Sequence, residues 1–395
     1  MRILVLHESD WIEKGPHQHH HLMERLSKKG HEIRVIDHEI LWKEDNYDGL
    51  ISKKNYFYKV HKAISEGDVT VIRPSIIKLP FIEYLSYICT RYNEINEQLT
   101  NFRPHVIVGL GILNPNIGIK LARRYSVPFV YYSIDENFRL VPQKYFRWIA
   151  RHLESKNIKN ADSVLSINED LREYTIEMGA DPKKTEVIRA GVDFERFSSA
   201  DGSAIREMYG LKEDDIVLFF MGWLYDFSGL KEVATELAKS DANNLKLLVL
   251  GKGDLWDYLQ SIKKEYGLDG KLITVDWCPY DEVPGYLAAS DICLLPAYKN
   301  DIMMNIVPIK MYEYMAAGKP VIATKLPGLM KEFGEGNGVV YVDRPEDALG
   351  MAIELVQQGT SGVEGKNAST FVKNLDWNTL TDEFERILIE QIVVV

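Results

Sequence analysis

Short apolar runs alternate with longer segments of helical periodicity along this chain. Arg2–Leu6, Glu32–Ile36 and Val106–Gly109 are apolar runs of four or five residues, the usual length of buried strands. Between the first two, His17–Lys29 has helical spacing and ends before a glycine. Strands that alternate with helices in this way predict parallel sheets with helices on both faces.

The same pattern continues to the end of the chain and breaks once, at the polar segment Ser198–Ser203. A chain of 395 residues is also too long for one common core. The sequence therefore predicts two doubly wound α/β domains, residues 1–197 and 203–376, followed by a helix at 377–395. The further strands expected are Phe129–Tyr132, Asp162–Ser166, Thr185–Ile188, Ile216–Met221, Leu245–Leu250, Leu272–Val275, Asp291–Pro296 and Val321–Thr324.

Composition narrows the class of protein. The chain is 46% hydrophobic with a formal net charge of −11, and an acidic chain is a poor candidate for binding nucleic acid. No run approaches 18 apolar residues, and the first strand is interrupted too early for a signal peptide. The three cysteines lie in apolar contexts and are interpreted as buried thiols, which indicates a reducing cytoplasm.

The stretch from Asn305 to Thr324 has the features of an anion site. Pro308 favours the start of a helix, so backbone amides at Ile306, Val307 and just beyond point out of that start. Lys310 adds a positive charge in the first turn. Glu313 follows one turn later, where a carboxylate can accept hydrogen bonds from a sugar diol.

Glycines at the ends of two strands support the same interpretation. Gly222 ends one apolar strand, and the Gly251-Lys252-Gly253 turn ends the next. A backbone without side chains allows phosphates to approach closely. A single Gly-x-Gly is a weak signal, but two such turns before the 305–313 segment make a nucleotide site the favoured hypothesis.

These motifs resemble those of the retaining glycosyltransferases of family 4, which have the GT-B fold. The resemblance implies two Rossmann-like domains that face a central cleft and a C-terminal helix that crosses back to the first domain. That family carries Glu-x7-Glu in this crossover, with a small residue, Gly and Pro-Val after it, and the resemblance covers nearly the whole chain. It implies that Glu313 binds the nucleotide ribose and that Asn305, Ile306, Val307 and Lys310 hold the donor sugar and phosphates. Cys278 falls where relatives cover the base.

Three positions depart from the family pattern. The first Glu of the motif is Asn305 here, and Trp223 and Ser228 stand where relatives carry the Arg and Lys that clamp the diphosphate. The loss of two cations removes stabilisation of the leaving group. Lys252 and Lys310, or stacking on Trp223, are the candidates to replace it.

On the acceptor side, the resemblance points to Gly15, in the glycine-containing loop after the first strand, and to neighbouring His17. Asp135 is the polar candidate nearest the reaction centre, with helix capping as its alternative role. His17 and His21 have the i, i+4 spacing of two zinc ligands, but no third ligand is evident. We expect neither a metal nor a cofactor.

Cations recur with aromatic residues between residues 139 and 159, a segment that we expect to form one helical stretch. This composition is typical of segments that rest on lipid headgroups. A solvated helix face with the apolar residues turned inward is the alternative. The residues concerned are Arg139, Lys144, Tyr145, Phe146, Arg147, Trp148, Arg151, Lys156 and Lys159.

The function that follows from the resemblance is that of a cytoplasmic, metal-independent, retaining hexosyltransferase. Its donor would be a nucleoside-diphosphate sugar, and its acceptor a glycan or a lipid-linked sugar, with peripheral membrane contact through the first domain. Two alternatives remain. One is a non-catalytic or subunit-like GT-B protein, and the other is a different enzyme on the same fold, such as a sugar-nucleotide epimerase.

Overall fold

The computed structural model describes residues 1–13, 16–39, 51–79, 82–300, 303–304 and 306–394. The chain divides into two compact units: unit 1 comprises Met1–Ala190 and Trp377–Val395, and unit 2 comprises Gly191–Asp376. The expected first domain ended at residue 197, whereas the short helix Phe194–Ser198 belongs to unit 2. The reason is local packing, because Phe197 lies edge-on to Tyr280 in unit 2.

Unit 1 is built on an eight-stranded sheet in the order β3-β4-β2-β1-β5-β6-β7-β8. All neighbours pair in parallel except β3, which runs antiparallel to β4 at the edge. The strands are β1 Arg2–Leu6, β2 Glu32–Ile36, β3 Asn55–Val60, β4 Val69–Arg73, β5 Val106–Gly109, β6 Phe129–Ser133, β7 Ser163–Ser166 and β8 Thr185–Val187.

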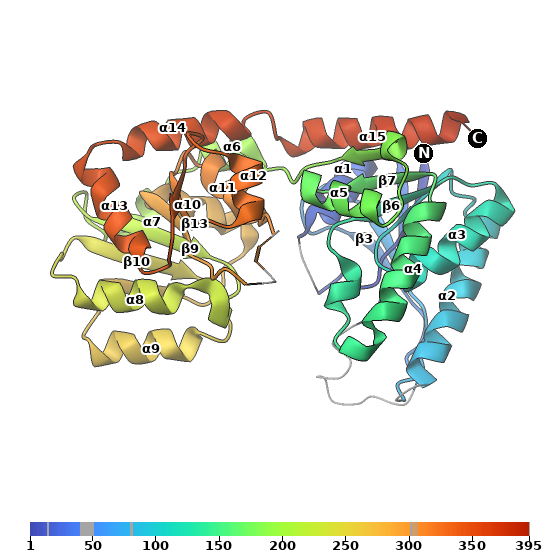
Figure 1. The fold of residues 1–395 in the computed structure, drawn as a ribbon, viewed down its shortest axis with the longest axis horizontal. Helices are drawn as coiled ribbons and strands as arrows, with labels where there is room; N and C mark the ends of the chain where they lie inside the picture. The colour runs from blue at the N-terminus through green and yellow to red at the C-terminus, as the bar shows by residue number, and fades with distance from the viewer. Residues whose placement is uncertain (14–15, 40–50, 80–81, 301–302, 305, 395) are drawn as a thin grey trace. The chain divides into compact units, whose positions relative to one another are not determined.

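Helices cover both faces of this sheet (Figure 1). The core on one face includes Leu22 of α1 and Phe384 of α15, and the core on the other includes Leu99 of α2 and Ile158 of α4. The C-terminal helix α15 is therefore part of unit 1. The helices are α1 Gln18–Lys28, α2 Ile82–Asn101, α3 Leu113–Tyr125, α4 Arg147–Asn160, α5 Glu169–Glu177 and α15 Trp377–Val394.

Unit 2 has a six-stranded, fully parallel sheet in the order β11-β10-β9-β12-β13-β14. This is the strand order of dinucleotide-binding folds. From β9 successive strands are added toward one edge, and from β12 they are added toward the other edge. The strands are β9 Ile216–Met221, β10 Leu245–Leu250, β11 Leu272–Val275, β12 Ile292–Leu295, β13 Val321–Thr324 and β14 Val339–Val342.

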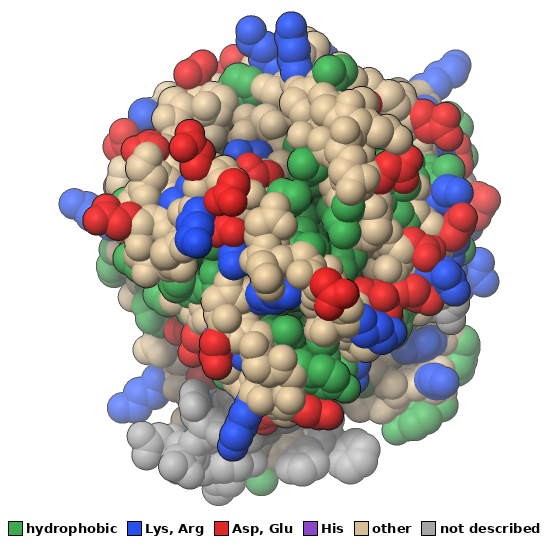
Figure 2. Space-filling model, turned by 90° about the vertical axis from the view of Figure 1, so that its left-hand side faces the viewer, with side chains coloured by type: hydrophobic (Ala, Val, Ile, Leu, Met, Phe, Trp, Pro, Cys, Tyr) green, Lys and Arg blue, Asp and Glu red, His purple; other side chains and the backbone are tan. Residues whose placement is uncertain are grey.

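The helices of unit 2 cover its sheet on both faces, and α8, α9 and α13 contribute to the core on one of them. On the face seen in Figure 2, acidic and basic side chains are interspersed. The helices are α6 Phe194–Ser198, α7 Ser203–Met208, α8 Leu230–Lys239, α9 Trp256–Glu265, α10 Val283–Ala289, α11 Ile309–Ala316, α12 Pro327–Phe333, α13 Asp347–Gln357 and α14 Ser361–Val372.

The predicted fold class, two Rossmann-like domains, is confirmed, but two local predictions are wrong. The 139–159 segment is not one helical stretch, because two 3-10 turns at Asn137–Leu140 and Lys144–Phe146 precede α4. Cys89 is an exposed thiol, since it lies on the outer side of α2, whereas Cys278 and Cys293 are buried as expected. Among the described residues, no helix is both long and apolar enough to cross a bilayer.

Candidate nucleotide-binding site

Unit 2 brings the predicted donor residues to the carboxyl edge of its sheet. Gly222 follows β9, the Gly251–Gly253 turn follows β10, and α11 begins after the loop that leaves β12. β9 and β12 are neighbours in the sheet, and the strand order reverses between them, which makes this edge the topological switch point of the sheet. Ligands of doubly wound sheets bind at this point.

The two glycine turns are packed backbone to backbone. Gly251 has a φ of 150°, and a Cβ atom built on it would lie 1.9 Å from the carbonyl oxygen of Gly222. Leu224 donates a backbone hydrogen bond of 3.0 Å to the carbonyl of Lys252 in the neighbouring turn. Only glycine fits at residue 251. We call the two adjoining turns, at Gly222 and at Gly251–Gly253, the glycine floor.

Lys310 connects the start of α11 to the end of β9. Its ammonium group donates a 2.8 Å hydrogen bond to the carbonyl of Met221 and lies 4.3 Å from the ring centre of Phe220. A Cβ atom on Gly222 would be 3.0 Å from the Lys310 nitrogen, so the glycine leaves room for this cation. Desolvation lowers the pKa of Lys310 to about 8, although nearby Glu313 opposes the shift.

Glu313 is 6% exposed, and its Oε1 accepts a 2.5 Å hydrogen bond from the hydroxyl of Tyr280. Burial raises the pKa of Glu313 above its usual value, while Tyr280, Lys310 and Arg196 act in the opposite direction. Arg196 lies over the Tyr280 ring at 4.7 Å and pairs with Asp281 at 2.5 Å. The carboxylate is therefore held on one oxygen by a tyrosine that is itself fixed.

The amides at the start of α11 only partly match the expectation. Ile306 is not a free donor, because its amide bonds to the carbonyl of Met303 at 3.4 Å. Pro308 caps the helix rather than lying in its first turn. The amides of Ile309 and Lys310 have no acceptor within the described parts of the chain, as is usual for the first turn of a helix. Asn305 lies outside the described residues.

Trp223 and Ser228 stand at the two positions where the family carries cations, and neither side chain is charged. Trp223 is 48% exposed, and its indole nitrogen lies close to Gly253, so that a Cβ atom there would be 2.8 Å away. Ser228 is buried, and its hydroxyl forms no hydrogen bond among the residues that the structure describes. Lys252 is exposed, and Cys278 is buried near the end of β11, where desolvation raises its pKa to about 11.

Unit 1 has an equivalent switch point, between β1 and β5, but a side chain of the protein occupies it. Glu8 follows β1, and its Oε1 accepts hydrogen bonds from the amides of Ile112 at 3.0 Å and Asn114 at 2.6 Å. These amides belong to the start of α3, the place where a doubly wound fold can bind an anion. Desolvation raises the pKa of Glu8 to about 7. The comparable helix start in unit 2 contains no such carboxylate among its described residues.

Asp135 lies just after β6, and its carboxylate does not cap the following 3-10 turn. Glu154 fixes that turn instead, by accepting hydrogen bonds from the amides of Asn137 at 3.2 Å and Phe138 at 3.0 Å. Desolvation and the charge of Glu154 raise the pKa of Asp135 to about 6. A half-buried carboxyl of this kind can exchange a proton near neutral pH.

The histidines after β1 are mostly part of the core. His21 stacks on Trp377 with ring centres 4.4 Å apart, and a nitrogen of His20 lies 3.1 Å from the carbonyl of Trp11. His17 is exposed at the start of α1, and Gly15 lies outside the described residues. In the described ranges, no three His, Cys, Asp or Glu side chains are grouped as metal ligands.

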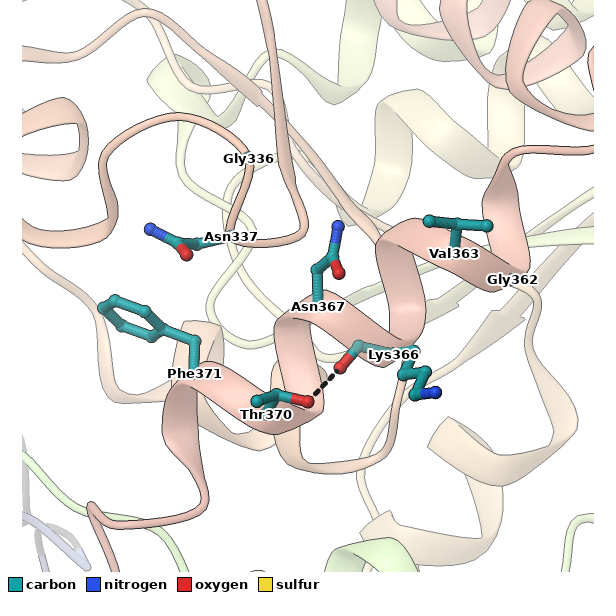
Figure 3. A pocket seen from close by; sticks show the side chains of 8 residues that line it. All are labelled: Gly336, Asn337, Gly362, Val363, Lys366, Asn367, Thr370 and Phe371. Atoms are coloured by element: carbon teal, nitrogen blue, oxygen red, sulfur yellow. Dashed lines mark hydrogen bonds between the residues drawn. The ribbon is translucent and has the colours of Figure 1, made fainter.

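An open pocket is also present elsewhere on unit 2, between α14 and the turn at Gly336–Asn337 (Figure 3). That turn leads into β14, so the pocket lies at the amino edge of the sheet. The Thr370 hydroxyl donates a 2.8 Å hydrogen bond to the carbonyl of Lys366, and the Asn337 side-chain amide donates one of 2.8 Å to the carbonyl of Phe333. The pocket is separate from the site built on Lys310 and Glu313.

Comparison with known families agrees with this architecture. Residues 201–375 match the family described as glycosyl transferases group 1, and residues 15–191 match the glycosyl transferase 4-like domain. The two matches together account for most of the chain. The protein belongs to the group 1 glycosyltransferases, of the type grouped as family 4.

Individual relatives are distant. The chain is 27% identical over 250 residues to the putative teichuronic acid biosynthesis glycosyltransferase TuaH of Bacillus subtilis, covering 59% of this chain and 58% of the relative. It is 26% identical over 321 residues to D-inositol 3-phosphate glycosyltransferase of Kribbella flavida, covering 72% and 74%. The matches to the first curated relatives span less than two thirds of those proteins.

Solved structures show the same fold over the full length. Anabaena Alr3699/HepE in complex with UDP superimposes with a TM-score of 0.71 at 16% identity, covering 99% of this chain and 100% of that one. Sucrose-phosphate synthase from Thermosynechococcus elongatus has a TM-score of 0.74 at 17% identity, with both chains fully covered. At these identities the similarity establishes the GT-B fold alone.

Proposed function

We propose that this protein is a retaining glycosyltransferase that moves a hexose from a nucleoside-diphosphate sugar to a glycan or a lipid-linked acceptor, without a metal or a cofactor. The observation that carries the proposal is the pair Lys310 and Glu313 at the start of α11, beside the glycine floor of unit 2. A cation and a diol-binding carboxylate one turn apart suit a diphosphate joined to a ribose.

Each residue then has a chemical task. The amides of Ile309 and Lys310 and the Lys310 ammonium group stabilise the diphosphate as it takes on negative charge. Glu313 accepts hydrogen bonds from the ribose hydroxyls, and Trp223 offers an aromatic surface to the donor. Sugar transfer with retention occurs on one face of the sugar, so the departing diphosphate helps to deprotonate the acceptor. We assign acceptor binding to unit 1, with Asp135 and His17 as the candidate residues.

The acceptor decides where in the cell the reaction takes place. If the acceptor is lipid-linked, unit 1 contacts the cytoplasmic face of a membrane. UDP is the first nucleotide to test, because the similar protein Alr3699/HepE was solved with UDP.

A non-catalytic donor-binding protein is the second candidate. It is favoured by Trp223 and Ser228, which stand in place of two cations of the family pattern. Among the described residues at the glycine turns, Lys310 and the exposed Lys252 are the cations that remain. Such a protein would bind nucleotide without releasing it from a sugar.

Nucleotide binding and turnover separate the candidates. We expect UDP, GDP or ADP to raise the melting temperature. The corresponding sugar nucleotide should release free nucleoside diphosphate when acceptor glycans or lipid-linked sugars are supplied. Binding without release across the acceptor panel would favour the non-catalytic protein. If none of the three nucleotides raised the melting temperature, the proposed site would be wrong.

Tyr280→Phe is expected to raise KM for the sugar nucleotide about fivefold with little change in kcat. The Tyr280 hydroxyl holds one oxygen of Glu313, and a hydrogen bond of this kind contributes about 1 kcal/mol. Steady-state kinetics test this, with Tyr286→Phe as the control, since the Tyr286 hydroxyl lies 3.4 Å from that of Tyr209 and is not bonded to Glu313 in the described residues. In a Glu313→Gln background Tyr280→Phe should add little, and a full independent effect would contradict the coupling.

A further inference from the structure

An exposed surface of unit 1 combines aromatic side chains with positive charge. Trp148 is 72% exposed, Tyr145 69% and Leu140 64%, although large apolar side chains are normally buried. These residues lie within nine positions of one another, on the 3-10 turns and the first turn of α4. The alternative noted above, with the apolar residues turned inward, therefore fails for this segment.

Exposed cations belong to the same segment as these side chains. Arg139 and Arg151 lie over the ring of Phe138, at 5.6 Å and 5.8 Å, which brings two basic residues from different turns together. Lys144 is exposed beside Tyr145. We define the aromatic-basic surface by its six residues Arg139, Leu140, Lys144, Tyr145, Trp148 and Arg151.

Negative charge is nearly missing from the same segment. Between residues 137 and 160 the sequence has six Lys or Arg residues and one carboxylate, Glu154. Glu154 is buried and accepts hydrogen bonds from the backbone amides of Asn137 and Phe138. The nearest other carboxylate, Glu136, pairs with Arg139 at 2.5 Å. This segment therefore has a net positive charge together with exposed aromatic rings.

We propose that the aromatic-basic surface docks on the headgroup region of a bilayer that contains anionic phospholipid. Tyr and Trp prefer the membrane interface, where a ring is half apolar and half hydrated. Lys and Arg beside them are attracted to anionic headgroups. The inference gives residues and a lipid class to the membrane contact proposed above, and it rests on that contact rather than on sugar transfer.

Vesicle binding tests the proposal with the full-length protein. We expect sedimentation with vesicles of phosphatidylcholine and phosphatidylglycerol in equal parts, and at least tenfold weaker binding to phosphatidylcholine alone. High salt should weaken the binding to the anionic vesicles. Equal binding to both vesicles, or no binding to either, would overturn the proposal.

Matched variants locate the contact. Lys144→Glu with Arg151→Glu should lower binding at least tenfold, while Lys120→Glu with Arg124→Glu, on two exposed cations of α3, should change it less than twofold. Tyr145→Ser with Trp148→Ser should also lower binding, in contrast to Tyr58→Ser, whose side chain is 71% exposed on β3. Equal losses in test and control variants would show that the surface is not the contact.

The nucleotide-induced rise in melting temperature serves as the independent readout. If it persists in every variant, the protein is folded and the donor site is intact. A variant that loses vesicle binding but keeps the nucleotide response then identifies the aromatic-basic surface as the membrane contact. If the wild-type protein itself shows no nucleotide response, the proposed function is contradicted and the membrane contact is not. If Trp148 enters the interface, lipids brominated in their chains should quench the wild-type emission more than that of Trp148→Phe.

Discussion

Glu313→Gln is expected to lower kcat/KM for the sugar nucleotide about 100-fold, mostly through KM. Glu313 is buried, so its carboxylate meets the ribose hydroxyls with little competition from water. A hydrogen bond to a charged group contributes about 1.5–3 kcal/mol, and the amide that replaces the carboxylate keeps the shape but loses the charge. Ribose contacts are made equally in the ground state and the transition state, so binding weakens while kcat is largely kept.

A nucleotide without the diol provides the sharpest readout. The wild-type protein should bind the ribonucleoside diphosphate much more tightly than its 2′,3′-dideoxy analogue, and in Glu313→Gln this preference should largely disappear. Glu332→Gln is the control, because Glu332 also accepts a hydrogen bond from a tyrosine of unit 2, the 2.9 Å bond from Tyr312. An unchanged preference for ribose in Glu313→Gln would remove this residue from the site.

Periodicity was enough to predict the parts of the fold in which local pattern and tertiary environment agree. Strands such as Ile216–Met221 and Leu245–Leu250 are buried on both faces, so they appear in the sequence as continuous apolar runs with clear ends. Strands β4 and β14 were not predicted, and neither was the edge strand β3. Its side chains are mostly exposed or half-buried, and it pairs antiparallel to β4, so no continuous apolar run marks it.

The candidate site was predictable where a single segment contains the chemistry. Lys310, Glu313 and the glycine turns lie on local motifs, and the structure gathers them at one edge of one sheet. Tyr280 was missed, because its partner Glu313 is 33 residues further along the chain and no local spacing links them. The role of Glu8 was hidden for the same reason, since it meets the start of α3 more than 100 residues later.

The groups at the start of α3 in unit 1 and at the start of α11 in unit 2 differ. This difference is why we assign donor binding to unit 2. In unit 1, the Glu8 carboxylate already accepts the amides that an anion would use. In unit 2, a cation lies at the corresponding point, held by the Met221 carbonyl. A diphosphate would find the amides already bonded at the first helix start and a cation at the second, which distinguishes two sheets of similar topology.

Lys310→Met is expected to lower kcat/KM by about 100- to 1000-fold, the range seen when one preorganised donor to a developing negative charge is removed. The wild-type pH profile should identify the same group. Desolvation lowers the pKa of Lys310 to about 8, so the ammonium form is present below that pH and is lost above it. If the cation binds the diphosphate, kcat/KM should fall above about pH 8 in the free enzyme.

Lys310→Arg separates charge from other causes of that alkaline decline. A guanidinium stays protonated throughout the range, so the decline above pH 8 should disappear even if the fit of the longer side chain lowers activity. Lys252→Met should keep the decline, because Lys252 is exposed at the neighbouring turn and Lys310 would still titrate. A decline that persisted in Lys310→Arg would show that another group titrates, and the diphosphate would then need a different cation from the one beside Gly222.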